Sequence, residues 1–279
     1  MPGLDSYPIE DSSASGADGP HSSSANENGG LDTPSDPAAL AEKLSVRLAE
    51  TDDLRARIDL IGGTIAGKIV FSTSLGLEDQ ALLHAIAGSP VSIEIVTLDT
   101  GRHFQETYDT LARSERRLKT RIKVFMPDAK DVEDLVARDG ISGFRDSVEN
   151  RKACCEVRKV RPLQRALAGA DAWITGLRRE QSANRDSTPF AAFDASQSLI
   201  KINPLADWSL DRVENYIETN SIPINPLHAE GFPSIGCQPC TRAIAPGEPI
   251  RAGRWWWENE DRKECGLHNR PRSPQGARL

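Results

Sequence analysis

The five cysteines are the residues of this chain whose types and spacing most clearly indicate chemistry. Cys154 and Cys155 are adjacent, Cys237 and Cys240 are separated by two residues, and Cys265 stands alone near the end of the sequence. Four thiolates suffice to enclose a zinc ion or an iron–sulfur cluster, so we predict that the two pairs form one metal cage. Cys265 is then left to act as a nucleophile, and its oxidation would require reducing equivalents from outside the chain.

The sequence favours a reducing compartment for these thiols. The first lysine is Lys43 and the opening residues contain no apolar run, so no secretory signal is predicted. No segment approaches the ~20 apolar residues that a membrane span needs. We therefore expect a cytoplasmic protein without membrane contact, in which paired cysteines are metal ligands or redox groups and not disulfides.

Residues 1–36 differ in composition from the rest of the chain. They are rich in Ser, Gly, Asp, Asn and Pro, and they include seven acidic residues but no lysine or arginine. Such a segment cannot bury enough apolar surface to offset the entropy lost on ordering, so we predict a disordered acidic tail. The formal net charge of −7 is the charge of this tail. Residues 37–279 are balanced in charge, have the length of one large α/β domain, and could bind an anion.

Short apolar runs alternate with amphipathic stretches over most of the remaining chain. The runs predict strands at residues 68–71, 91–98, 122–125 and 172–175. Helical spacing predicts helices at residues 38–61, 78–87, 104–118, 131–138 and 157–167. This alternation predicts an α/β fold with a mostly parallel twisted sheet and helices on both faces. Ligands of such sheets bind beyond the carboxyl ends of the strands.

Three loops follow predicted strands and therefore belong to this ligand-binding edge. Residues 72–79 offer hydroxyls and amides to a phosphate at a helix N-terminus, although such residues are also ordinary helix caps. This loop lacks the Gly-Lys-Ser/Thr of a Walker loop. Residues 98–101 could lie against an adenosine or be simply a turn. Residues 175–185 are rich in arginine, which binds phosphate or sulfate through bidentate hydrogen bonds, although a solvated charge run is the usual alternative.

Four motifs together carry a resemblance to a known family. They are FSTSLG at residues 71–76, LDTG at 98–101, GLRREQS at 176–182 and ECGLH at 264–268. In this combination and order the chain resembles the assimilatory sulfonucleotide reductases, which have an adenine nucleotide alpha-hydrolase-like fold related to the PP-loop proteins. The cysteine pairs resemble the iron–sulfur branch, the thioredoxin-dependent adenylyl-sulfate (APS) reductases. The resemblance extends from about Lys68 to His268.

The resemblance implies a reaction of assimilatory sulfate reduction and cysteine biosynthesis. Cys265, as a thiolate, would attack the sulfur of adenosine 5′-phosphosulfate (APS), release AMP and become an S-sulfocysteine. Thioredoxin, as a separate protein, would then release sulfite. The two cysteine pairs would hold one [4Fe–4S] cluster. We also expect a mobile C-terminal catalytic segment, at about residues 245–279, because Cys265 must reach both a substrate and a partner protein.

The resemblance also implies a set of substrate-binding residues. The cationic ones would surround the phosphosulfate, although each could instead be a surface cation or, for the histidine, a structural residue: Lys159, Arg185, Arg251, Arg254 and His268. Lys159 follows the cysteine pair by one helical turn, and Arg251 and Arg254 share one side if their segment is helical. The other expected contacts are Ser72, Thr73, Ser74, Leu75, Gly76, Leu98, Asp99, Thr100, Arg178 and Arg179.

Three other functions stay open. A reductase of the 3′-phosphorylated nucleotide (PAPS) would share most motifs but generally lacks the four cysteines. An iron–sulfur RNA-modifying enzyme of related fold would need a Ser-Gly-Gly-x-Asp-Ser loop, and the balanced charge predicts no nucleic-acid binding. A zinc-stabilised nucleotide-binding module would leave Cys265 without a role. Copies of the chain could also associate as a homo-oligomer.

Overall fold

The computed structural model describes residues 36–181 and 185–258 of the chain. Cys265, His268 and all but the last residue of the predicted acidic tail lie outside the described residues. That last residue, Asp36, caps the first helix, because its carboxylate accepts a hydrogen bond from the amide of Ala38 at 3.1 Å. Among the described helices, none is both long and apolar enough to cross a lipid bilayer.

Six strands form one sheet. They are β1 (Ile69–Thr73), β2 (Glu94–Leu98), β3 (Lys123–Phe125), β4 (Ala172–Ile174), β5 (Ala191–Asp194) and β6 (Leu199–Ile202). Their order is β3-β2-β1-β4-β6-β5, and every pairing is parallel except that of β5 with β6. Phe71 of β1 pairs with Ile95 of β2 on one side and with Ile174 of β4 on the other. The predicted mostly parallel sheet is therefore confirmed.

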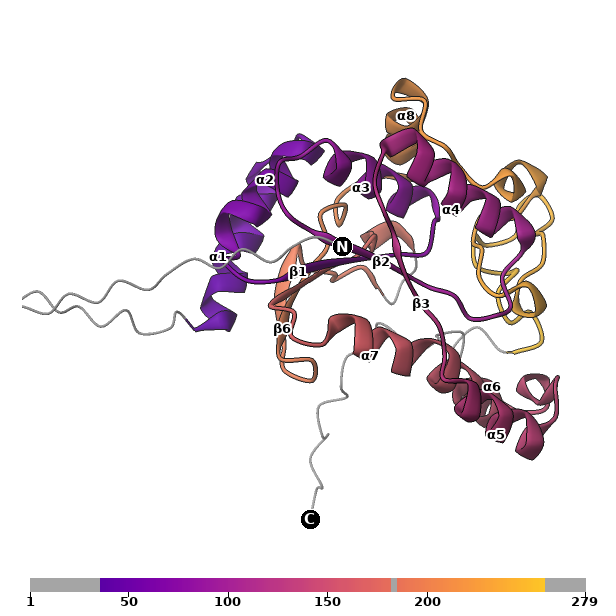
Figure 1. The fold of residues 1–279 in the computed structure, drawn as a ribbon. Helices are drawn as coiled ribbons and strands as arrows, with labels where there is room; N and C mark the ends of the chain where they lie inside the picture. The colour runs from indigo at the N-terminus through magenta and orange to yellow at the C-terminus, as the bar shows by residue number, and fades with distance from the viewer. Residues whose placement is uncertain (1–35, 182–184, 259–279) are drawn as a thin grey trace, which may run out of the picture. The chain divides into compact units, whose positions relative to one another are not determined.

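Helices pack on both faces of this sheet (Figure 1). The described α-helices are α1 (Pro37–Glu50), α2 (Leu54–Thr64), α3 (Leu77–Ala87), α4 (Gln105–Leu118), α5 (Ala129–Asp139), α6 (Val148–Cys155), α7 (Arg161–Leu167) and α8 (Leu210–Thr219). On one face, Ile69 and Phe71 of β1 share a core with apolar residues of α1, α2, α3 and α8. On the other face, Val70 packs with Trp173 and with Leu163 of α7. Alternate residues of β1 point to opposite faces, so a strand buried on both sides has a continuous apolar sequence.

One predicted helix is wrong in its extent. The apolar spacing predicted a single helix over residues 38–61, whereas the structure contains α1 and α2 with a break at Thr51. Thr51 is extended (φ −102°, ψ 115°), and the carboxylate of Asp53 accepts a hydrogen bond from the amide of Ala56 at 2.8 Å. A side chain that satisfies the first amides of a helix lets a new helix begin there. The second helix then continues through its two glycines to Thr64.

The remaining predicted elements are confirmed with shifted boundaries. The second strand begins at Glu94 and not at residue 91, and β5, β6, α6 and α8 were not predicted. The predicted helix over residues 157–167 consists of a π-helical turn, η2 (Glu156–Val160), followed by α7. Cys155 ends α6 directly before this turn, and Lys159 lies within it. A π turn redirects the side chains of a helix and is frequent at functional sites.

Candidate active site

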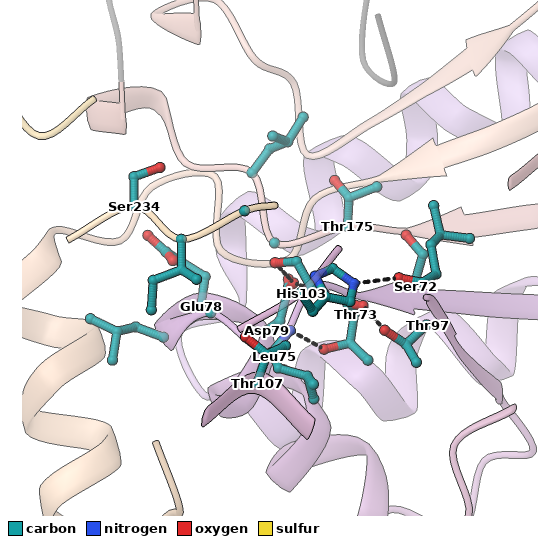
Figure 2. A pocket seen from close by; sticks show the side chains of 18 of the residues that line it. Ser72, Thr73, Leu75, Glu78, Asp79, Thr97, His103, Thr107, Thr175 and Ser234 are labelled. Carbon is teal, nitrogen blue, oxygen red and sulfur yellow. Dashed lines mark hydrogen bonds between the residues drawn. The ribbon is translucent and has the colours of Figure 1, made fainter. Parts of the chain in front are cut away.

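A cavity of about 660 Å³ opens at the carboxyl ends of β1, β2 and β4. Figure 2 shows the polar side chains that these strands place around it, among them Ser72, Thr97 and Thr175. Its volume is that of a pocket for a nucleotide-sized ligand, and its location is the ligand-binding edge of parallel sheets. Most of the predicted substrate-binding residues line it: Ser72, Thr73, Ser74, Leu75, Gly76, Leu98, Asp99, Thr100, Lys159, Arg178, Arg185, Arg251 and Arg254.

The loop between β1 and α3 is held by its own side chains. Leu75 has a positive φ of 62°, and its amide donates a hydrogen bond to Thr73 Oγ1 at 2.9 Å. The amide and the hydroxyl of Ser74 both donate to Asp79 Oδ2, at 2.6 and 2.7 Å. Burial raises the pKa of Asp79 to about 6, although the hydrogen bonds from Ser74 favour the carboxylate. Sequence reasoning gave Asp79 no role, because an acid in the first turn of a helix is an ordinary partner of the helix dipole.

The loop after β4 uses its first two arginines for contacts within the protein. Arg178 is buried and forms an ion pair with Glu78 at 2.8 Å. Gln181 donates a second hydrogen bond to Glu78 at 2.9 Å, so this acid connects the loop to the start of α3. Arg179 lies outside the cavity wall and donates to the carbonyl of Thr188 at 3.0 Å. These contacts indicate that Arg178 and Arg179 shape the loop.

The loop after β2 presents a carboxylate at the cavity. Asp99 Oδ1 accepts hydrogen bonds from the amide of Gly101 and the hydroxyl of Tyr108, both at 2.8 Å. Burial and the contact with Asp99 raise the pKa of Tyr108 to about 12, so its hydroxyl remains a donor at neutral pH. The thiol of Cys237 donates to Thr100 Oγ1 at 3.3 Å, which connects this loop to the cysteine region.

Cationic side chains come to the cavity wall from outside the sheet. Lys159 reaches it from the π turn behind the cysteine pair, and Arg185 reaches it from the loop after β4. Arg251 and Arg254 were expected to share one side if their segment were helical. Their segment instead forms turns, in which the amide of Arg254 donates to the carbonyl of Arg251 at 2.9 Å and Arg254 forms a bridge with Thr241. Both arginines still line the cavity, where cations can bind phosphate or sulfate oxygens through charge-assisted hydrogen bonds.

The predicted metal ligands line a second, smaller cavity. The four cysteines are free thiols there: Cys154, Cys155, Cys237 and Cys240. Lys159 and Trp255 line both cavities, so the two sites share a wall. Over residues 36–181 and 185–258, no three His, Cys, Asp or Glu side chains are grouped as ligands of one metal ion.

The four thiols differ in their electrostatic surroundings. Burial raises the pKa of Cys154, and burial together with the neighbouring Cys237 raises the pKa of Cys240 to about 12. Burial also disfavours the thiolate of Cys237, yet Lys159 and the hydrogen bond with Thr100 hold its pKa below the ordinary value. The thiolate, which is the metal-binding form of cysteine, is therefore favoured at Cys237 relative to an unperturbed thiol.

Comparison with known proteins gives consistent matches. The family model described as "Phosphoadenosine phosphosulfate reductase domain" matches residues 68–243. The "Adenosine 5'-phosphosulfate reductase" of Agrobacterium fabrum is 54% identical to this chain, over 77% of the chain and 83% of that protein. The protein of the same name from Sinorhizobium fredii (strain NBRC 101917 / NGR234) is 54% identical over 82% of this chain and 91% of its own length.

A solved structure is similar over a comparable length. The phosphoadenylyl-sulfate (PAPS) reductase from Candida auris, in a phosphate complex, superposes with a TM-score of 0.60 at 26% sequence identity. The match covers 73% of this chain and 96% of that structure.

Proposed function

This chain belongs to the phosphoadenosine phosphosulfate reductase domain family, and from that premise we propose that it reduces APS to sulfite and AMP. Relatives that share 54% of their residues with it over most of both chains carry the name of this activity. The observation that carries the proposal is the shared wall between a nucleotide-sized cavity and a cavity lined by four cysteines.

The polar strand ends suit the nucleotide part of APS. Asp99 and the hydroxyls of the loop after β1 offer hydrogen-bond partners for a ribose, and Leu98 and Trp173 offer apolar surface for a base. The parallel strands hold these groups at fixed distances, so the nucleotide part of the site is preorganised.

The cations of the cavity suit the phosphosulfate part. Lys159, Arg185, Arg251 and Arg254 line the wall, and His268 is a further proposed contact outside the described residues. Such donors stabilise the negative charge that develops on the phosphate as AMP leaves. Electrostatic stabilisation of this kind is the largest contribution to the rate enhancement of many enzymes. The sulfur of APS is electrophilic because AMP is a good leaving group.

We propose Cys265 as the nucleophile, although it lies outside the described residues. Its thiolate would form a bond to the sulfur of APS while the sulfur–oxygen bond to phosphate breaks, and the electron pair would leave with AMP. A thiolate of thioredoxin would then attack Cys265 Sγ and release sulfite with the electron pair of the broken sulfur–sulfur bond. The second thiol of thioredoxin would resolve the mixed disulfide, so thioredoxin ends oxidised. We place this reaction in the cytoplasm.

We further propose that the four cysteines hold one [4Fe–4S] cluster. Each cysteine of such a cluster binds a different iron, so the four sulfurs surround the cluster without converging on a single ion. Four thiols that line one cavity supply the ligand number of such a cluster, and adjacent cysteines such as Cys154 and Cys155 are unusual in zinc sites, which favour spaced pairs. When bound, the cluster would supply a fixed electrostatic field beside Lys159. Iron and sulfide analysis should give about four of each per chain, and one zinc without sulfide would contradict the proposal.

One experiment tests the function directly. Purified protein is incubated with APS in the absence of reductant, and the peptide that contains Cys265 is analysed by mass spectrometry. We expect one added sulfonate, its release as sulfite when thioredoxin is supplied, and neither result in a Cys265→Ser variant. Equal sulfite production by Cys265→Ser would refute the proposal. Parallel measurement with PAPS decides between the two nucleotides, because a higher kcat/KM for PAPS would favour a PAPS reductase.

A further inference from the structure

A buried ion pair joins the helix of the first cysteine pair to the last described residue of the chain. Arg151 Nη2 lies 2.7 Å from Glu258 Oε2, and Arg151 Nε donates to Glu258 Oε1 at 2.9 Å. The two side chains are 1% and 3% exposed. This bidentate arrangement fixes the relative orientation of both groups as well as their distance.

The pair is part of the wall that encloses the cysteines. Arg151 lies on α6 and lines the small cavity together with Cys155. Its guanidinium group stacks over the ring of Trp255 at 4.6 Å. The amide of Trp255 donates to the carbonyl of Cys240 at 3.1 Å, and the amide of Glu258 donates to the carbonyl of Trp255 at 2.8 Å. Glu258 is therefore linked to Cys240 through the backbone of Trp255, and through Arg151 to the cavity wall that includes Cys155.

A gain in the stability of the fold does not by itself explain why this ion pair is buried. Removing two charges from water costs several kcal/mol per ion, and a buried ion pair is often no more stabilising than apolar residues of similar volume. What a bidentate pair does provide is a defined geometry between two segments, here α6 and the end of the described chain. Cys265 follows Glu258 by seven residues in the sequence, and seven residues span at most ~25 Å.

We propose that Arg151 and Glu258 form an anchor that holds the start of the Cys265 segment beside the substrate cavity, and that both are positioning residues of the reaction. This inference rests on the proposed function. A tether that begins at a fixed point next to the cavity keeps the thiolate at a high effective concentration near the substrate. Release of the anchor would lower the rate of Cys265 sulfonation and leave nucleotide binding unchanged, because Arg151 and Glu258 do not line the large cavity.

The test compares two variants that each break a bidentate pair between a buried arginine and a carboxylate. Glu258→Gln breaks the anchor. Asp207→Asn breaks the pair of Arg57 with Asp207, whose closest atoms are 2.6 Å apart and which does not line either cavity. The measurements are iron content, AMP affinity, the rate of tryptic cleavage after Arg254, and the single-turnover rate of Cys265 sulfonation at saturating APS.

We expect Glu258→Gln to keep its iron and to bind AMP within about twofold of wild type. Trypsin should cleave after Arg254, which is 7% exposed, faster in this variant than in wild type, because brief local openings of this segment become more frequent while the closed form that binds AMP stays dominant. Sulfonation should slow about tenfold or more, since small displacements of a reacting group cost up to about 100-fold. Asp207→Asn should match wild type in cleavage and in sulfonation rate. If Glu258→Gln loses iron, Glu258→Asp is measured instead, because it keeps the charge but shortens the reach to Arg151.

Each other outcome is decisive. Unchanged cleavage after Arg254 in an iron-loaded Glu258 variant would show that the pair does not hold the segment. Faster cleavage with a wild-type sulfonation rate would show that holding the segment has no role in the reaction. A wild-type protein that forms no adduct with APS would refute the proposed function itself, and with it the role of the anchor.

Discussion

The two walls of the large cavity are built in different ways. The sheet wall, residues 72–79, 98–100 and 175–178, consists of loops at the ends of parallel strands, whose positions follow from the hydrogen-bond ladder of β1, β2 and β4. The cysteine wall belongs to residues 148–160 and 234–258, which form the short helix α6, a π turn, one 3₁₀ turn (Gln238–Cys240) and irregular chain. Side-chain contacts such as Arg151 with Glu258 hold the cysteine wall together. The comparison indicates that backbone hydrogen bonds between strands fix the sheet wall, whereas side-chain contacts fix the cysteine wall.

The walls also differ in charge. The acids of the sheet wall are Glu78, Asp79 and Asp99. The cations of the cysteine wall are Lys159, Arg251 and Arg254. Arg178 and Glu78 neutralise each other, so Asp79 and Asp99 are the acids that remain, and Arg185 is a further cation from the loop after β4. The division favours a substrate orientation with the nucleoside at the sheet wall and the phosphosulfate at the cysteine wall, from which the chain continues to Cys265.

Removal of the proposed iron–sulfur cluster should have the most different effects on the two walls. Metal binding and folding are coupled in sites whose ligands come from distant segments, so the apo protein should lose hydrogen-exchange protection in the cysteine wall by about 1,000-fold or more. Strands β1 and β2 should keep theirs. Hydrogen exchange with mass spectrometry, before and after chelation, measures this directly. Equal loss of protection in both walls would show that the cysteine wall is not a separate unit.

Loss of the charge of Lys159, at the wall that the two cavities share, should have the next largest effect. Lys159 lines both cavities, so Lys159→Met removes a charge from the phosphosulfate and from the cysteine cage at once. We expect kcat/KM for sulfite formation to fall about 100-fold or more, the usual effect of removing one donor from a charge-stabilising site. Lys68→Met is the control, since Lys68 pairs with Glu94 at 3.1 Å and does not line the cavity. A Lys159→Met activity within threefold of this control would contradict the assignment.

The raised pKa of Asp79, the buried acid of the sheet wall, should make the stability of the protein depend on pH. The folded protein holds the proton of Asp79 more tightly than the unfolded chain, with a pKa of about 6 against 3.8. The stability contributed by this proton is therefore complete below pH 3.8 and is lost as the pH rises through about 6. Wild type should lose on the order of 2 kcal/mol relative to Asp79→Asn between about pH 4 and pH 7.

Thermal melting of wild type and Asp79→Asn over this pH range measures the difference. Asp59→Asn is the matched control, because Asp59 is exposed although it accepts a hydrogen bond from Ser89 at 2.5 Å. A stability difference between wild type and Asp79→Asn that stays constant with pH would rule out the raised pKa. A carboxyl signal that titrates near pH 6 by NMR, and is missing from Asp79→Asn, would identify the group.

A change far from both walls should have the smallest effect. Asp53→Ala removes the cap that begins α2, and loss of such a cap costs about 1 kcal/mol of stability. AMP affinity and iron content should stay as in wild type, because the helix packs on the sheet away from either cavity wall. Glu50→Ala, a change of an exposed acid at the end of α1, should alter the melting temperature less. An Asp53→Ala variant as stable as Glu50→Ala would show that the cap does not define the helix start.

Much of the sheet wall could be predicted from the sequence. Apolar runs that are buried on both faces predicted β1 and β4 within a few residues, and the loops that follow them line the cavity as expected. The strands β5 and β6 were missed, because their sequences, AAFD and LIKI, each include a charged residue and form no continuous apolar run. The break between α1 and α2 was missed because a continuous apolar stripe outweighs one capping side chain in a periodic pattern.

The charged residues of the site were harder to assign. Arg178 and Arg179 looked like anion-binding residues, but Arg178 pairs with Glu78, one hundred positions away, and Arg179 lies outside the cavity. Arg151 and Asp79 had no assigned role, although both are buried and hold parts of the two walls. In the sequence, nothing distinguishes a charged residue with a distant partner from one that faces solvent.

The sequence by itself determined the alternation of strands and helices, the loops that reach the ligand edge, and the grouping of four cysteines apart from Cys265. These features depend on periodicity and spacing within short segments, where side chains a few positions apart share a face. Only the tertiary structure decided which charged side chains pair with each other inside the protein and which line the cavity. Charge pairing acts over a few ångströms between groups such as Arg151 and Glu258, 107 positions apart, and packing alone brings such groups together.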